Sequence, residues 1–583
     1  MGRLGPPSSA ANTRERNRKN GVREMTGRYR WCAAWAVALA LVSGCHAEDA
    51  HDSSAAAVTL MSGRLQGVRF GDQRNGVAFL GVPYAAPPTG ELRWKPPEPI
   101  APWAGMRDAT QFGAACPQLP EPWLNYPHWS EDCLFLNVWT RQMSARHKQP
   151  VIVFFHGGSN RAGYSQRDQL GPSLSRSGLV VVSANYRLGP LGFLAHPALT
   201  AESGHASSGN YGLLDQIQAL RWVRENIARF GGDPGRITVM GQSSGGVDAC
   251  LLMASPLARG LFQQAILESG ECQSTLNKDI RTPISVNGIS GTGEEAGRRL
   301  ADDLGITNGP DILKKLRGVP VVTLLKAMST DRNLQFDAIV DGWVVAEQPA
   351  KIFAEGRQAH IPVLVGSNAD EATVFGPGPA TLSEYRKYLQ ANAGIYADQE
   401  FQAWPASSDA DVPGQYLKLE NMSFAYGAWS MARATTRARQ PAYLYLFTWN
   451  QTGKRASLGA SHGEELPFLD DAYPSSWGSS SGDQAFGEIL RTYWSNFAMT
   501  GDPNSPGLPK WPAFDPGSDY VFSLGQKIGP VPMNQNLRVW DKIMAQILSE
   551  EQPVAWVVMR RKSLGAMWRE WGLPRGACSF AAI

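Results

Sequence analysis

Residues 239–249 read VMGQSSGGVDA and place two adjacent serines between glycines. The stretch fits the pattern G-x-S-x-G with Ser243 at its centre. The apolar run 237–240 precedes it and the helix-compatible run 247–253 follows it, so this serine stands at a turn from strand to helix. Glycines suit so tight a turn because larger side chains would collide with the sheet and the helix. A Gly/Ser turn without chemistry is the alternative, but the context favours a nucleophilic Ser243.

The sequence around this turn predicts the sheet that the turn needs. An amphipathic helix is predicted over 213–230, where apolar residues recur at three- and four-residue steps. Strands alternating with helices predict an α/β fold, a mostly parallel central sheet flanked by helices, with ligands at the strand carboxyl ends. The mixed stretches 271–355 and 375–440 are predicted to be helical insertions over that edge. Apolar runs without polar alternation, as in strands buried on both faces, occur at 151–155, 179–185, 237–240, 265–267, 362–366 and 442–447.

A nucleophilic serine needs a base and a carboxylate, and in such folds the chain order is serine, acid, histidine. Asp370 and Glu371 follow the predicted strand 362–366, and His462 follows the next one. Taken singly, the carboxylates fit an exposed loop cap and the histidine fits a solvated turn. Their order at successive strand ends instead predicts a catalytic triad.

Longer segments of the chain resemble the type B carboxylesterases, a group of α/β-hydrolases. The resemblance covers residues 58–548 and implies the α/β-hydrolase fold, hydrolysis of a small-molecule carboxylic ester, and no cofactor. The segments, in family order, include FLGVPYAAPPTGELRWKPPEP (79–99), EDCLFLNVW (131–139), HGGS (156–159), NYRLGPLGFL (185–194), GQSSGG (241–246), ADEATVF (369–375), SHGEELPF (461–468) and WSNFAMTGDPN (494–504).

The resemblance also implies roles for individual residues. It implies a Ser–Glu–His triad, three backbone N–H groups that form an oxyanion hole, and one disulfide. It places Ser269 beside the triad, where a supporting hydrogen bond is expected. The triad is Ser243 as nucleophile, Glu371 as acid and His462 as general base; the oxyanion donors are Gly158, Ser159 and Ser244; the disulfide joins Cys116 to Cys133.

Some positions depart from the family pattern. Gln242 stands where many members carry Glu, and Ser159 and Asn160 stand where a small residue and a bulky apolar residue are usual. Cys250 and Cys272 could pair, although their places in the predicted elements do not require them to meet. A non-catalytic adhesion or scaffold protein of this fold is an alternative, but it would lack a triad member. A lipase, thioesterase or carbamate hydrolase would use the same triad.

Both ends of the chain lie outside the predicted domain. Basic residues precede the apolar run 31–42, which is too short to span a bilayer but fits an export signal. The sequence VSGC ends at Cys45 and resembles a bacterial lipoprotein box, so acylation of Cys45 and membrane attachment are expected; ordinary cleavage near Ala47 is the alternative. We therefore expect an exported periplasmic or membrane-anchored protein. The predicted parts are a leader over 1–45, the esterase domain over 58–548 and an extension over 551–583.

Composition excludes two other classes of function. The 55 Lys and Arg residues nearly balance the 52 Asp and Glu residues, and the net charge of +3 predicts no nucleic-acid-binding groove. The seven cysteines form no CxxC pair and the nine histidines no HExxH motif, so no metal site is expected.

Overall fold

The computed structural model describes residues 56–549, except 122–123, 125–127, 144–145, 167–169, 275, 284–290, 331–333, 335, 454, 472–476 and 479. The predicted leader over 1–45, its Cys45, and the extension over 551–583 lie outside the described residues. Within the described part of the chain, no helix is both long and apolar enough to cross a membrane.

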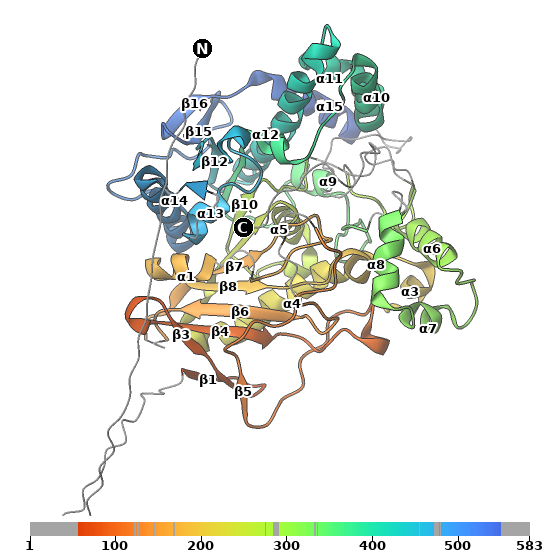
Figure 1. The fold of residues 1–583 in the computed structure, drawn as a ribbon, viewed down its shortest axis with the longest axis vertical. Coiled ribbons are helices and arrows are strands. Elements are labelled where there is room, and N and C mark those ends of the chain that lie inside the picture. The colour runs from red at the N-terminus through yellow and green to blue at the C-terminus, as the bar shows by residue number, and fades with distance from the viewer. Residues whose placement is uncertain are drawn as a thin grey trace, which may run out of the picture. The chain divides into compact units, whose positions relative to one another are not determined.

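One large sheet forms the centre of the domain (Figure 1). Its strands pair in parallel from β15 to β8, and the pairs beyond them are antiparallel, so the predicted mostly parallel sheet is confirmed. In spatial order, the eleven strands described in this sheet are β16 (Gly529–Pro532), β15 (Tyr520–Leu524), β12 (Ala442–Phe447), β11 (Val363–Asn368), β10 (Gln264–Glu268), β9 (Gly232–Gln242), β7 (Gln149–Phe155), β8 (Val180–Ala184), β6 (Phe135–Thr140), β4 (Gly76–Pro83) and β3 (Val68–Phe70).

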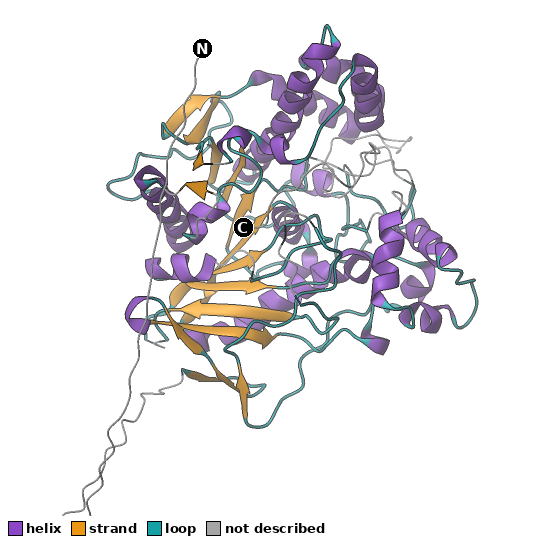
Figure 2. Cartoon of the chain, viewed as in Figure 1, coloured by secondary structure: helices purple, strands orange, loops and turns teal. Residues whose placement is uncertain are grey.

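Helices cover both faces of this sheet, which explains why its central strands are apolar without alternation (Figure 2). In β7, Val151 and Val153 enter one hydrophobic core, whereas Ile152 and Phe154 enter the other. The first core is closed by α4 (Tyr211–Asn226), α5 (Ser244–Ala254) and α12 (Val412–Arg437), and the second by α1 (Leu170–Leu174), α13 (Leu466–Asp470) and α14 (Ser481–Thr500).

The two predicted insertions are helical and begin where β10 and β11 end, at the carboxyl edge of the sheet. In Figure 1, α3, α6, α7 and α8 lie near one another, and α10 and α11 lie near α15. The first insertion holds α6 (Gly293–Asp303), α7 (Ile312–Arg317), α8 (Val321–Thr330) and α9 (Pro349–Ala354); the second holds α10 (Leu382–Ala393), α11 (Ala397–Ala403) and α12. The other elements are α2 (Gly189–Phe193), α3 (Pro197–Glu202), α15 (Arg538–Ser549), β1 (Ala57–Thr59), β2 (Arg64–Gln66), β5 (Met106–Asp108), β13 (Thr452–Gly453) and β14 (Trp477–Gly478).

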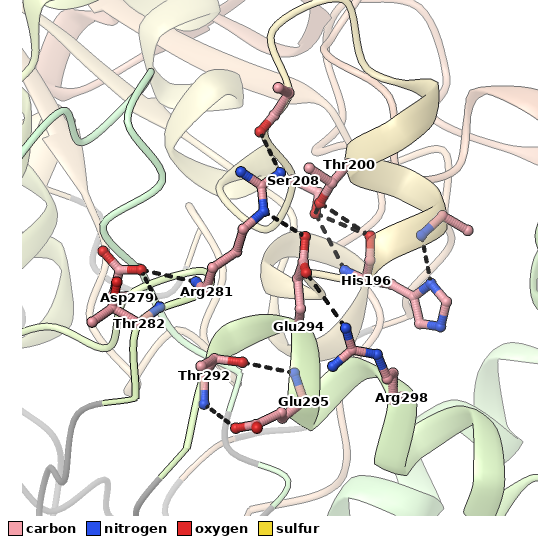
Figure 3. A network of polar contacts seen from close by, with 12 residues as sticks. His196, Thr200, Ser208, Asp279, Arg281, Thr282, Thr292, Glu294, Glu295 and Arg298 are labelled. Carbon is pink, nitrogen blue, oxygen red and sulfur yellow. Dashed lines mark hydrogen bonds and ion pairs between the residues drawn. The ribbon is translucent and has the colours of Figure 1, made fainter.

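A polar network joins the first insertion to the helical segment around α3 (Figure 3). Thr292 and Glu295 form a capping box at the start of α6, which satisfies backbone donors of its first turn. The buried Glu294 lies 3.4 Å from Arg281 and 3.7 Å from Arg298. Burial and the nearby Arg298 lower the pKa of His196. The network therefore orients α6, although such partly exposed ion pairs contribute little stability.

Two disulfides lie at the carboxyl edge of the sheet. Cys116 is joined to Cys133, as the resemblance implies. Cys250 of α5 is joined to Cys272, which follows β10. This second pair, left open by the sequence, ties the helix of the predicted elbow to the end of the neighbouring strand.

Candidate active site

Five adjacent strands end around one point of the sheet. β7, β9, β10, β11 and β12 are neighbours in that order, and each predicted site residue follows the end of one of them. Ser243 follows β9, Ser269 follows β10, Glu371 lies three residues after β11, and His462 lies in the loop after β12. The sheet topology therefore gathers residues such as Ser243 and His462, which are 219 positions apart in the chain.

Ser243 has the strained backbone of a nucleophile elbow. Its φ of 56° and ψ of −126° lie outside the usual regions for a side chain, and α5 starts at the next residue. Its N–H donates to Glu268 O at 2.8 Å, which holds the turn against β10. A Cβ added to Gly245 would stand 2.1 Å from Phe155 O. The elbow can approach β7 this closely only with glycine there.

Glu371 and His462 are in direct contact. Glu371 Oε2 lies 2.5 Å from His462 Nδ1, and the two side chains are 0% and 7% exposed. The other oxygen of Glu371 accepts from Ser269 Oγ at 2.5 Å and from Asn368 N at 2.7 Å. Asp370, the other candidate acid, instead accepts from the N–H of Ala460 and holds the histidine loop.

The far nitrogen of His462 faces Gln242. Gln242 Nε2 lies 3.2 Å from His462 Nε2, so the amide donates and the ring nitrogen accepts. This assignment leaves Nδ1–H to donate to Glu371, which is the tautomer that a general base requires. The rings of Phe375 and Phe424 lie 5.1 Å and 5.4 Å from the imidazole and shield it from water.

The predicted oxyanion loop lies against the elbow. A Cβ added to Gly157 would be 2.9 Å from Ser243 Cβ, so this loop and the serine are in contact. Gly158, Ser159 and Asn160 have successive φ angles of 119°, 58° and 54°. Ser244 occupies the first turn of α5, where backbone N–H groups are not used by the helix. The two segments that carry the three proposed donors therefore meet at Ser243.

A second buried carboxyl lies near Glu371. Glu465 is 0% exposed, and its Oε2 accepts from Asn368 Nδ2 at 2.5 Å. Burial, and then repulsion from Glu371, raise the pKa of Glu465 to about 8. Burial also raises the pKa of its neighbour Glu464 to about 7. Glu465 is therefore shifted toward its neutral form, and Glu371 is the acid whose side chain contacts the histidine.

Sequence reasoning missed the contact of Gln242 with His462 and the buried position of Glu465. The position of Gln242 beside the nucleophile was a usable signal, whereas nothing in the sequence distinguishes Glu465 from a solvated acid. Within the described residues, no three His, Cys, Asp or Glu side chains gather as a metal ion would need.

A serine on a strained strand-to-helix turn, followed along the chain by an acid and a histidine that contact each other, is typical of the serine hydrolases of the α/β-hydrolase class. The chain belongs to the carboxylesterase family: the model of the family described as "Carboxylesterase family" matches residues 54–540. The chain is 36% identical to the fumonisin B1 esterase of Sphingopyxis macrogoltabida, over 80% of this chain and 86% of that protein.

Two further relatives agree. The chain is 33% identical to the para-nitrobenzyl esterase of Bacillus subtilis (strain 168), over 81% of this chain and 95% of that protein. A solved structure of a PNB esterase superimposes with a TM-score of 0.69 at 30% identity, over 82% of this chain and 97% of that one. These relatives confirm the predicted family and fold, and the chain is a carboxylic ester hydrolase.

Proposed function

We propose that the protein hydrolyses uncharged carboxylic esters through the triad Ser243, His462 and Glu371 and a covalent acyl-enzyme. The observation that carries this proposal is the 2.5 Å contact of Glu371 Oε2 with His462 Nδ1, in a ring whose other nitrogen contacts Gln242, the residue before a serine held at φ 56°. A buried carboxylate in that contact orients the ring and stabilises the imidazolium that forms during proton transfer.

The reaction proceeds in two halves. Ser243 Oγ replaces Gln242 Nε2 at His462 Nε2, which accepts the Ser243 proton while Oγ bonds to the ester carbonyl carbon, and the carbonyl oxygen becomes an oxyanion. The N–H groups of Gly158, Ser159 and Ser244 stabilise that oxyanion, and the loss of one such donor typically costs about 3 kcal/mol of barrier. The C–O bond then breaks, the alcohol leaves with the proton from His462, and water repeats the sequence on the acyl-enzyme.

Two features support an uncharged substrate. The side chain next to the nucleophile, Gln242, is a neutral amide that contacts His462. The rings of Phe375 and Phe424 add an apolar wall beside the same histidine. The names of two relatives, a fumonisin B1 esterase and a para-nitrobenzyl esterase, also support an ester of a small organic molecule. A lipase, a thioesterase or a carbamate hydrolase would share the triad and differ in the shape of the pocket.

The test uses p-nitrophenyl esters from acetate to palmitate. Ser243→Ala should abolish turnover of p-nitrophenyl butyrate, whereas Ser244→Ala should retain it, because Ser244 acts through its backbone N–H. A several-fold loss in Ser244→Ala is expected, since its Oγ accepts from the N–H of Asn160 at 3.2 Å. Full activity of folded Ser243→Ala would refute the proposal.

We also propose that the protein is exported and attached to a membrane through an acylated Cys45, with residues 58–548 as its esterase domain. Two disulfides in the domain support an oxidising compartment.

A further inference from the structure

The oxyanion loop has a backbone that must be held in place by its surroundings. Ser159 and Asn160 both have left-handed backbone angles, which non-glycine residues adopt at a cost. Asparagine tolerates this conformation better than most residues, and serine less well. Two such residues in succession persist only where neighbouring groups fix them.

Asn160 supplies contacts that fix the loop on several sides. Its Nδ2 donates to Asp248 Oδ1 at 3.0 Å and to Asp337 Oδ1 at 2.9 Å, which uses both hydrogens of the amide. Its backbone N–H donates to Ser244 Oγ at 3.2 Å, and its carbonyl accepts from Gly189 N at 2.6 Å. The side chain is 1% exposed, so these contacts are made out of water.

Asp248 lies on α5, four residues after Ser244, and therefore on the same face of the elbow helix. It is 0% exposed, and its second oxygen accepts from Gln216 Nε2 of α4 at 2.6 Å. A buried carboxyl held only by neutral amides is costly, and burial raises its pKa to about 7 although both amides lower it. An apolar side chain would serve stability better, so the position of Asp248 calls for another reason.

We propose that Asp248 is a positioning residue for ester hydrolysis: through Asn160 it fixes the loop that carries the oxyanion donors Gly158 and Ser159 against the elbow. The inference rests on the proposed function. Ser244 supplies one donor N–H, and its helix also carries Asp248. The contact between the side chains of Asp248 and Asn160 thereby joins the elbow helix to the loop. This contact keeps the three donor N–H groups at fixed distances from one another. Gln216 holds the carboxyl from the opposite side.

The test compares substitutions that break or keep the contact between Asp248 and Asn160. Asp248→Ala should lower kcat for p-nitrophenyl butyrate by about 10- to 100-fold and leave KM within threefold. Deleting an oxyanion donor typically lowers kcat by about 10²- to 10³-fold, and a donor that is only displaced should lower it less. Binding of a trifluoromethyl ketone, whose adduct with Ser243 carries an oxyanion, should weaken by a similar factor.

Asp248→Asn should restore kcat to within about threefold of the wild type. An asparagine keeps an oxygen for Asn160, and Gln216 can turn its Oε1, which lacks a hydrogen-bond partner among the described residues, toward the new amide. Asn160→Gly breaks the same contact from the loop side while tolerating positive φ, and should resemble Asp248→Ala. Gln216→Met is the matched control: it removes the other contact of Asp248, and should lower Tm with little change in kcat.

Hydrogen exchange of the peptide covering 156–163 gives a readout that does not depend on activity. Exchange should be faster in Asp248→Ala and Asn160→Gly than in the wild type, Asp248→Asn and Gln216→Met. Wild-type kcat and wild-type exchange in Asp248→Ala would overturn the inference, as would equal damage from Gln216→Met. A wild type that hydrolyses no ester would refute the proposed function instead, and loop exchange would still decide whether Asp248 holds the loop.

Discussion

Glu465 carries a proton in the folded protein that it loses when the chain unfolds. Its pKa is raised from 4.5 to about 8 by burial and by the nearby Glu371. Between those two pH values the native state binds one more proton than the unfolded state. Stability therefore falls as pH rises through this interval, and the loss is complete above about pH 8.

Glu465→Gln replaces the protonated acid with a neutral amide of the same size. One pKa unit corresponds to about 1.4 kcal/mol, so the penalty that wild-type Glu465 accumulates from pH 5 to 8 is on the order of 4 kcal/mol. The variant escapes this penalty. Its free energy of unfolding, relative to that of the wild type, should rise with pH by up to that amount. At pH 7 its kcat should stay within a few-fold of the wild type, because the wild-type residue is already neutral.

Urea unfolding at pH 5, 6.5 and 8 measures this trend. Glu464→Gln provides a comparison of smaller size, because the pKa of Glu464 is raised only to about 7. The free energy of unfolding of this variant, relative to that of the wild type, should rise less with pH and should level off above about pH 7. A stability difference for Glu465→Gln that does not change with pH would refute the reasoning. A variant that loses stability relative to the wild type as pH rises would refute it as well.

Three other outcomes are expected. An imidazole must be neutral to accept the Ser243 proton, so kcat/KM should fall on acidification; a flat profile down to about pH 4 would contradict His462 as base. Cys45→Ser should abolish incorporation of a palmitate analogue in a Gram-negative host; unlabelled wild-type protein cut near Ala47 would favour ordinary cleavage. Because Gln242 supplies no charge, kcat/KM for butyrylcholine should exceed that for 3,3-dimethylbutyl butyrate by less than about tenfold, or ~1.4 kcal/mol; a larger preference would indicate a working cation site.

Much of the fold could be predicted because its signals are local. The apolar run at 151–155 lies within β7, and the run at 362–366 overlaps β11 from Val363 onward, since strands buried on both faces favour apolar residues without alternation. The helix predicted over 213–230 is α4 with a 3₁₀ turn after it. Chain order and strand ends predicted the positions of the pair Asp370 and Glu371 and of His462, because the topology brings those ends together, and the family resemblance selected Glu371.

The remaining features depend on pairs of side chains that only the folded chain brings together. Asn160 and Asp248 are 88 positions apart and Gln242 and His462 are 220, so no local pattern links them. Cys250 and Cys272 pair because β9 and β10 are neighbours, a register that the sequence does not specify. In each case a one-residue shift of a strand or loop would separate the partners.

Several residues at the carboxyl edge of the sheet have strained backbone angles, and nearby hydrogen bonds hold them in place. Ten residues other than glycine have positive φ in the described part of the chain, and four of them are Ser159, Asn160, Ser243 and Ser269. Each of the last three is held by its own backbone N–H, which donates to Ser244 Oγ, Glu268 O and Gly366 O respectively. Strained residues lose their geometry when such contacts break. In the proposed mechanism, the buried hydrogen bonds around the site therefore act on catalysis through position, since each would keep a reacting or donor group where the oxyanion forms.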